Sequence, residues 1–332
     1  MKTQGDVRDW NATRFDPTGT RGHVESYFLK LNDRAGRRAL WLKATILARR
    51  GDGAKVAEAW AIAFDREREH VGAKQVVPFD RARFSSDRLD VRVADLALEP
   101  GHVVGSVESG GRRIDFALAF TTTSPPLTLF PSARMYEGPL PSTKLVSPYP
   151  NATFTGHYAI DNERVEVTGW RGMQGHNWGT GHAELYAWAH CNEWEGEDDL
   201  IFEGVTARVR VGPLLSPPVT ALAVWRRGVR YAFNQPLTLL RNRGTIGQRR
   251  WAFRAESHLA RVEGELSAET RDLVGLHYEN PGGAMTYCLN SKIAEGALRL
   301  EVKGRPPFTA RTRAAALEIG TRDPEHGVTM LL

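Results

Sequence analysis

The sequence predicts an all-β protein built from two antiparallel β-barrels with few short helices. Three observations lead to this fold class: short strands recur at roughly ten-residue spacing, apolar and polar residues alternate within many of them, and stretches with a 3.6-residue period are scarce. A parallel α/β sheet is disfavoured, because it needs helices between its strands. With 332 residues in the chain, each half would hold about as many residues as one eight-stranded closed barrel.

Two kinds of segment predict the strands. Strict alternation, typical of half-buried strands, occurs over residues 89–93, 114–120 and 165–167. Fuller apolar runs rich in Trp, Ile, Val and Phe cover residues 39–48, 56–64 and 200–211. Residues 56–64 also fit a short helix because of their alanines, and the best helical stretch is 309–318 near the carboxyl end.

A change of composition at residues 121–151 predicts the division into domains. This segment begins with threonines and a serine and then contains seven prolines, at positions 125, 126, 131, 139, 141, 148 and 150. Since proline cannot donate to a strand ladder, we expect a loop or linker here. The boundary near residue 150 gives an N-terminal barrel, 1–150, and a C-terminal barrel, 151–332, that carries the aromatic and histidine site described below.

Charge and cysteine content exclude several classes of function. The 44 Lys and Arg are interspersed with 39 Asp and Glu, for example over residues 65–69, which indicates mixed charged faces and no nucleic-acid partner. Cys191 and Cys288 are far apart, so we expect free thiols in a reducing cytoplasm. The first 25 residues carry charges throughout and no apolar run reaches about 18 residues, so neither a secretory signal nor a transmembrane segment is predicted.

Aromatic residues and histidines gather between Trp170 and Trp194, which contain four of the nine tryptophans and three of the ten histidines. As a strand, residues 184–194 would place large side chains on one face and mostly small ones on the other. The large face suits a ligand cavity, although rings and polar tips of this kind also line filled cores. It consists of Glu184, Tyr186, Trp188, His190, Asn192 and Trp194.

The segment before this strand, residues 172–182, contains four glycines and predicts a turn. Its spacing matches neither a phosphate loop nor a dinucleotide-binding motif, so we reject nucleotide binding. His176, His182 and His190 fit no zinc spacing, and no metal site is predicted. A Gly-x-Ser-x-Gly elbow is absent from the sequence, which leaves carboxylates as proton donors. Burial among aromatic rings would favour the neutral form of such a carboxyl, and four are candidates: Asp161, Glu184, Glu193 and Glu203.

Three stretches resemble the lipocalin-like double-barrel family. They are residues 25–30 with 40–43, the segment Gly175-His176-Asn177-Trp178-Gly179, and Trp188-Ala189-His190-Cys191-Asn192. That family contains carotenoid 1,2-hydratases (hydroxyneurosporene synthases), AttH-like proteins, tocopherol cyclase and some fungal Diels–Alderases. The resemblance implies two lipocalin-like barrels, a cavity at or near their junction, and polyene or prenyl-like ligands handled without an organic cofactor.

These observations lead to three hypotheses. The first is a cofactor-independent cyclase, hydratase or isomerase that protonates an alkene of a hydrophobic isoprenoid, polyene or polyketide-like molecule, since Trp and Tyr faces stabilise cations. The second is a lipocalin-like carrier of an apolar ligand, and the third is an interaction protein whose barrels are filled by side chains. For the enzyme, the catalytic candidates are Glu203, Asp161, His190 and Tyr186, and the ligand-binding candidates are Arg171, His176, Asn177, Trp178, His182, Glu184, Trp188, Asn192 and Trp194.

Overall fold

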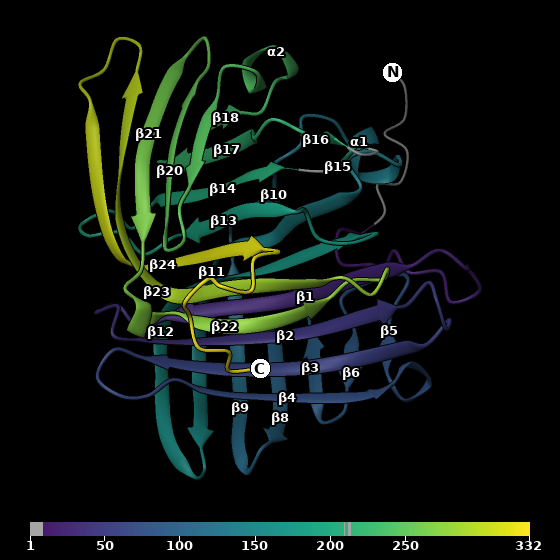
Figure 1. Cartoon of the computed structure of the whole chain (residues 1–332). Coiled ribbons are helices and arrows are strands. Elements are labelled where there is room, and N and C mark those ends of the chain that lie inside the picture. The colour runs from purple at the N-terminus through teal and green to yellow at the C-terminus, as the bar shows by residue number, and fades with distance from the viewer. Residues whose placement is uncertain (1–8, 209, 212–213) are drawn as a thin grey trace, which may run out of the picture.

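The computed structural model describes residues 9–208, 210–211 and 214–332. Strands of these residues form two large antiparallel sheets that lie one above the other in Figure 1. The predicted all-β fold of two barrels is therefore confirmed. The first sheet has, in spatial order, β4 (Val71–Pro78), β3 (Lys55–Asp65), β2 (Arg38–Ala48), β1 (His23–Asn32), β12 (Glu163–Gly179), β11 (Thr143–Ile160), β9 (Arg112–Thr122), β8 (His102–Ser109), β7 (Leu96–Glu99), β6 (Val91–Val93) and β5 (Arg83–Phe84), with β10 (Leu127–Thr128) beside β11.

The second sheet makes the upper barrel of Figure 1. Its order is β18 (Val229–Phe233), β17 (Val219–Arg226), β14 (Leu200–Arg208), β13 (Leu185–Cys191), β24 (Phe308–Thr321), β23 (Met285–Val302), β21 (Ala260–Ser267), β20 (Arg250–Glu256) and β19 (Arg243–Ile246), with β22 (Val274–Glu279) beside β23. The remaining elements are short: the pair β15 (Arg210–Val211) and β16 (Leu214–Leu215), the helices α1 (Arg134–Glu137) and α2 (Pro236–Leu239), and the 3-10 turns η1 (Phe79–Arg81) and η2 (Thr270–Asp272).

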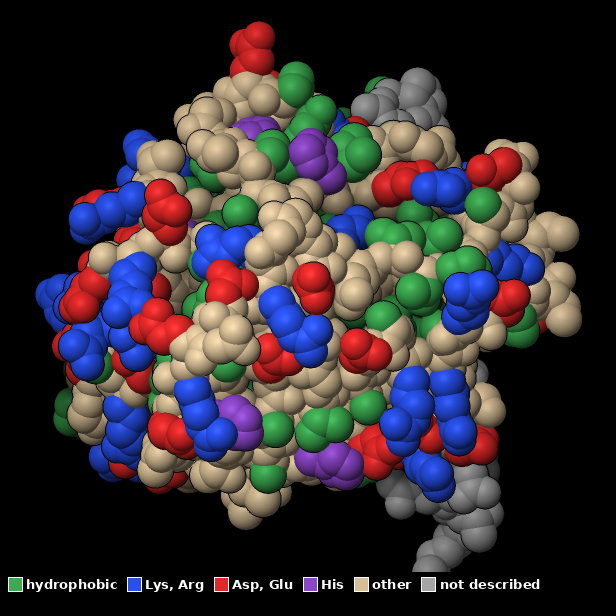
Figure 2. Space-filling view, turned by 90° about the horizontal axis from the view of Figure 1, so that it is seen from below, with side chains coloured by type: hydrophobic (Ala, Val, Ile, Leu, Met, Phe, Trp, Pro, Cys, Tyr) green, Lys and Arg blue, Asp and Glu red, His purple; other side chains and the backbone are tan. Residues whose placement is uncertain are grey.

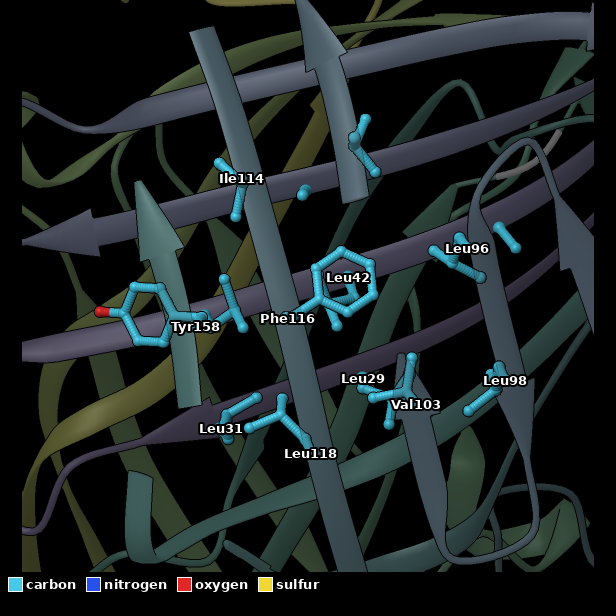
Figure 3. Close-up of a cluster of buried hydrophobic side chains, with 14 of the residues drawn as sticks. Leu29, Leu31, Leu42, Leu96, Leu98, Val103, Ile114, Phe116, Leu118 and Tyr158 are labelled. Atoms are coloured by element: carbon cyan, nitrogen blue, oxygen red, sulfur yellow. The ribbon is translucent and has the colours of Figure 1, made fainter. Parts of the chain in front are cut away.

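Side chains fill the interiors of both barrels. The first sheet curls so that β4 comes against β8, where the Lys74 backbone N–H donates to Ser109 Oγ at 2.9 Å. Figure 3 shows the result: Leu29 and Leu42 from β1 and β2 point toward Phe116 and Val103 from β9 and β8. In the second barrel the interior is packed with apolar side chains such as Trp251. A ligand cavity is therefore to be sought outside these two cores.

Strands β1, β2 and β3 are buried on both faces. One face of each turns into the first barrel, and the other packs against the second barrel, for instance through Trp41 and Trp60, which meet Tyr278 and Ile293. This double burial explains why residues 39–48 and 56–64 are continuous apolar runs. Residues 56–64 belong to the strand β3, which is buried on both of its faces, so the alternative of a short helix is wrong.

Two predicted elements are wrong. Residues 309–318 lie within β24, a central strand between β13 and β23, where alanines allow close packing on both faces. Residues 172–179 are the end of β12, and their glycines serve close packing between strands. A Cβ on Gly172 would collide with the Lys30 carbonyl oxygen, and a Cβ on Gly175 would collide with the Phe28 ring.

The chain leaves the first sheet later than the prolines suggested. Strands β11 and β12, which extend from Thr143 to Gly179, belong to the first sheet, and β13 opens the second. As a division between sheets, the position near residue 150 is therefore corrected to the loop between Gly179 and Leu185. Prolines 148 and 150 are accommodated because the pairing of β11 with β12 shifts register between Val146 and Ala152.

Charges of both signs lie side by side on the face in Figure 2, in keeping with the mixed charged faces expected from the sequence. In the described part of the chain, helices are too short to span a bilayer. The carboxyl end of the chain crosses from the second barrel to the first. Leu331 N–H donates to the Gly275 carbonyl at 2.8 Å, and Leu331 and Leu332 pack beside the cluster between the barrels.

Candidate functional site

A cavity of about 320 Å³ opens between the two barrels. Its lining is buried at Trp41, Lys43 and Trp188, and its mouth lies at Ser142 and Val219, which are exposed lining residues. Strands of both sheets and the proline-rich segment form its walls. The lining residues are Phe28, Trp41 and Lys43 from the first sheet, Tyr186, Trp188, Val205, Ala207, Val219, Ala221, Tyr278 and Glu318 from the second, and residues 129–131, 135, 141–145, 177, 182, 183 and 239.

The aromatic wall comes from β13, where alternation places Tyr186 and Trp188 on the face toward the first barrel. On the other face, Ala187, Ala189 and Cys191 enter the core of the second barrel. The Trp188 ring meets Phe28 edge to face at 5.6 Å between centroids. The predicted division of this strand into a large and a small face therefore holds for residues 186–191.

A buried carboxyl fixes the Trp188 ring from behind. Trp188 Nε1–H donates to Glu203 Oε1 at 3.1 Å, and Ser147 Oγ lies 2.9 and 2.8 Å from the two carboxyl oxygens. Burial raises the pKa of Glu203 to about 7, although both hydrogen bonds favour the carboxylate. Glu203 is fully buried and does not line the cavity, so it contacts the ligand space only through Trp188.

His182 lies in the loop before β13 and is held by Asn280. The Asn280 side-chain nitrogen donates to three oxygens, so its Oδ1 accepts, 3.1 Å from His182 Nδ1. Nδ1 therefore carries the hydrogen, and Nε2 has no partner within the described residues. Burial lowers the pKa of His182 to about 4, which makes the ring neutral at neutral pH.

Two tyrosines lie near this histidine. The rings of Tyr186 and Tyr278 are nearly parallel to His182, at 6.5 and 5.2 Å between centroids. Burial raises the pKa of both hydroxyls well above their usual value, so they are donors and not phenolates.

Three lysines lie around the inner end of the cavity. Lys292 Nζ bonds Glu318 Oε1 at 2.7 Å, and Lys74 Nζ bonds Glu58 Oε1 at 2.9 Å. Lys43 Nζ instead lies 3.8 Å from the centre of the Tyr278 ring. Desolvation lowers the pKa of Lys43 to about 8.

The structure places several predicted site residues away from this cavity. His176 is buried at the end of the first barrel, where Glu25 accepts from its Nε2 at 2.9 Å and the Trp10 carbonyl from its Nδ1 at 2.6 Å. Glu25 also accepts from His23 Nε2 at 2.7 Å and Tyr27 hydroxyl at 3.0 Å. This fully bonded cluster braces β1 against β12. Trp178 packs beside it, 4.8 Å from His176.

Four others are structural contacts at the base of β13. Strand β13 ends at Cys191, so Asn192 and Trp194 leave its alternation. Trp194 packs into the second barrel, and Asn192 donates to the Gly172 carbonyl at 2.7 Å. His190 Nε2 lies 2.8 Å from the Pro150 carbonyl, and Arg171 donates to the Asp198 carbonyl at 2.6 Å.

Like Glu203, the other three predicted carboxylates are absent from the cavity lining. Asp161 occupies an exposed turn, where a backbone hydrogen bond from Arg113 and the Arg112 side chain at 2.6 Å lower its pKa. Glu184 lies 3.9 Å from Arg322, and Glu193 lines a separate groove. Of the predicted site residues, the cavity thus brings together Asn177, His182, Tyr186 and Trp188.

Sequence reasoning missed Lys43, Tyr278, Glu318 and the wall formed by residues 129–145. A lysine inside the apolar run 39–48 was the available signal for Lys43. For Glu318 the signal was a glutamate directly after the apolar run of three alanines and a leucine. In the described ranges, groups of three or more His, Cys, Asp or Glu arranged to hold a metal ion are absent.

No family model matches the chain. It is similar to the uncharacterized proteins Rv0493c and MT0513 of two Mycobacterium tuberculosis strains, H37Rv and CDC 1551, each 25% identical over 287 residues that cover 86% of this chain and 83% of the relative. Similar solved structures include an AttH-like protein from Nitrosomonas europaea, with a TM-score of 0.54, 13% identity and coverage of 91% of this chain and 93% of that chain.

Two further similar structures extend the comparison. Kievitone hydratase from Nectria haematococca has a TM-score of 0.56 and 11% identity, with 90% of each chain covered. CghA with Sch210972 has a TM-score of 0.61 and 11% identity, with 90% of this chain and 88% of that chain covered. The chain has the AttH-like fold. The family resemblance is thereby confirmed for the fold, and its likeness to carotenoid hydratase and tocopherol cyclase stays a prediction.

Proposed function

We propose that the cavity between the barrels binds a hydrophobic small molecule of isoprenoid, polyene or polyketide type, and that the protein cyclises, hydrates or isomerises it without an organic cofactor. One observation carries this proposal. The walls are aromatic and aliphatic, while Tyr186, Tyr278 and His182 reach the cavity in neutral form. Such a site binds apolar molecules, and these three side chains supply hydrogen-bond donors and an acceptor that carry no charge.

The chemistry we assign to this site is proton transfer at a polarised double bond. The Tyr186 hydroxyl donates a hydrogen bond to a carbonyl or enol oxygen of the ligand. His182 Nε2 takes a proton from one carbon of the conjugated system and returns it to another, so the histidine ends the cycle neutral. A tyrosine with a raised pKa is too weak an acid to protonate an isolated alkene, so the proposed substrate carries its double bond in conjugation with an oxygen. Aromatic faces such as Trp188 stabilise positive charge that develops on the ligand, by about 0.5 to 2 kcal/mol.

Glu203 is proposed as a positioning residue. Its carboxyl holds the indole of Trp188 at the cavity wall, and it acts on the ligand through that ring. Asp161, in its exposed turn, is not part of the proposed site.

A carrier is the second candidate. It is favoured because Glu203, the carboxyl with a near-neutral pKa, lies behind Trp188 and does not reach the ligand space. Solvent extraction of the purified protein, followed by mass spectrometry, should recover a bound apolar compound. That compound is then incubated with fresh wild-type protein. Conversion to an isomer, a hydrate or a cyclised product supports the enzyme, whereas recovery of the unchanged compound supports the carrier.

Substitution of a tyrosine in the cavity wall tests whether that residue takes part in the reaction. Tyr186→Phe should lower kcat by about tenfold or more while changing the ligand Kd little, because only the donated hydrogen bond is lost. Tyr158→Phe is the matched control, since Tyr158 is buried in the core of the first barrel. If Tyr186→Phe retains full kcat, the assigned role of Tyr186 is wrong.

A further inference from the structure

The charges at the inner end of the cavity do not balance. Lys43, Lys74 and Lys292 face Glu58 and Glu318, so three positive charges meet two negative ones. Glu318 is bonded to Lys292, and it also accepts from Asn290 Nδ2 at 3.1 Å. Glu58 is bonded to Lys74 and accepts from Trp60 Nε1 at 3.1 Å. Each carboxylate is therefore already paired.

Of these three lysines, Lys43 is the one without an ion pair closer than 4.0 Å among the described residues, although Glu318 and Glu58 favour its charged form from a greater distance. Its side chain belongs to a residue only 6% exposed, and among the described residues no carboxylate oxygen lies within 4.0 Å of Nζ. Its neighbours are aromatic faces, with Tyr278 at 3.8 Å and Trp41 and Trp60 at 5.6 Å. A ring face offsets only part of what an ammonium loses when it leaves water.

The position of Lys43 makes this charge available to a ligand. Lys43 and Trp41 share the face of β2 that turns away from the first barrel, and both line the cavity. The neighbours of Lys43 in sequence, Leu42 and Ala44, point into the first barrel. An ammonium without a close ion pair thus sits at the buried end of an apolar space whose exposed lining residues include Ser142 and Val219.

We propose that the cavity takes an amphipathic ligand whose apolar body lies against Phe28, Trp41 and Trp188 and whose anionic oxygen group, a carboxylate, enolate or phenolate, binds Lys43. This inference rests on the proposed function in that it assumes an apolar occupant. It adds the polarity and the direction of binding: the acidic end lies inward and the apolar end lies toward the mouth. A buried charge-assisted hydrogen bond of this kind is strong and selective.

A pair of fluorescent probes tests the proposal. 8-Anilinonaphthalene-1-sulfonate and N-phenyl-1-naphthylamine share one apolar skeleton, and only the first carries an anionic group. Lys43→Met should raise the Kd of the sulfonate by about tenfold or more, since a hydrogen bond to a charged group is lost. The Kd of the neutral probe should change by less than about twofold, because methionine keeps the apolar stem.

Lys55→Met is the matched control. Lys55 begins β3 and is not among the residues that line the cavity, and its Nζ donates to the Pro17 carbonyl at 2.5 Å. This variant removes the same charge and should leave both affinities unchanged. Displacement of the neutral probe by 2-naphthoate and by its methyl ester then tests a carboxylate: wild type should prefer the acid, and Lys43→Met should lose that preference.

The outcomes separate the two proposals. If the neutral probe binds but Lys43→Met leaves the affinity for the sulfonate unchanged, or weakens both probes equally, the anionic end is refuted and the apolar cavity stands. If neither probe binds the wild-type protein, the proposed function itself fails. Retained binding of the neutral probe by Lys43→Met shows that the variant is folded.

Discussion

Replacing Glu203 by glutamine should change how the stability of the protein depends on pH. Glutamine keeps the shape of the side chain and an oxygen that accepts from Trp188 Nε1–H, but it cannot ionise. In the wild-type protein the carboxyl is fully buried, and burial raises its pKa from 4.5 to about 7. The folded state therefore binds a proton between these two pH values that the unfolded state has released.

The size of the effect follows from the pKa difference. Each pKa unit is worth about 1.4 kcal/mol, so the wild-type protein should lose about 3 kcal/mol of unfolding free energy from this group as pH rises from 4.5 through 7. The sign is set by the raised pKa: the contribution is fully present below pH 4.5 and is lost above about pH 7. Glu203→Gln has no such ionisable group, so its free energy of unfolding should rise relative to that of the wild type as pH rises.

Urea unfolding of both proteins at pH 5 and pH 8 measures this gain. The difference in unfolding free energy between variant and wild type should shift in favour of the variant by about 2 to 3 kcal/mol between the two pH values. Glu67→Gln, an exposed carboxylate 3.9 Å from Arg37, serves as the control and should show little shift. Equal differences for Glu203→Gln at pH 5 and pH 8 would refute a buried carboxyl with a near-neutral pKa.

Three further changes test the packing and the charges. Gly172→Ala should lower the free energy of unfolding by about 1 to 3 kcal/mol, because its Cβ would collide with the Lys30 carbonyl oxygen. The control Gly51→Ala, whose Cβ meets no atom within 4 Å, should change it by less than about 0.5 kcal/mol. Urea unfolding of both variants measures the difference, and equal stabilities would contradict the collision at Gly172. Lys43→Met should raise the free energy of unfolding at pH 7 by up to about 3 kcal/mol, because folding lowers the pKa of Lys43 from 10.5 to about 8. This gain over the wild type should vanish above pH 10.5, where the lysine is neutral in both the folded and the unfolded state. If variant and wild type are equally stable at pH 7, the ammonium of Lys43 is not desolvated. Glu25→Gln should lower the free energy of unfolding at pH 7 by about 3 to 5 kcal/mol, since it breaks a buried network with two histidines. Because the pKa of Glu25 is lowered in the folded state, the stability difference from the wild type should become smaller only as pH falls below 4.5. If thermal unfolding shows no loss of stability in the variant, the bracing role is refuted.

Much of the fold was predictable because strand periodicity is a local property. The alternation at 114–120 became the half-buried strand β9, and the run at 39–48 became β2. The predictions that relied on alanines and glycines, a helix at 309–318 and a turn at 172–182, failed for a common reason. These residues lack large side chains, so the structure they adopt depends on what packs against them. Residues 309–318 are a central strand between β13 and β23, and Gly172 allows β12 to approach β1.

The candidate site was predictable only in part. Tyr186 and Trp188 follow from alternation within one strand, because neighbours in sequence decide which side chains share a face. Glu203 was among four carboxyls that looked alike, and only burial behind Trp188 distinguishes it. The proline-rich segment reads as a linker by composition, yet Leu129, Phe130 and Pro141 line the cavity.

The sequence alone determined the all-β class, the strands with their inner and outer faces, and the gathering of aromatic residues in one segment, since each depends on residues near one another in the chain. The tertiary structure decided which faces meet. Lys43 and Glu318 are 275 positions apart in the sequence and line one cavity, and whether a lysine has a counter-ion depends on pairings between distant strands that no local pattern encodes.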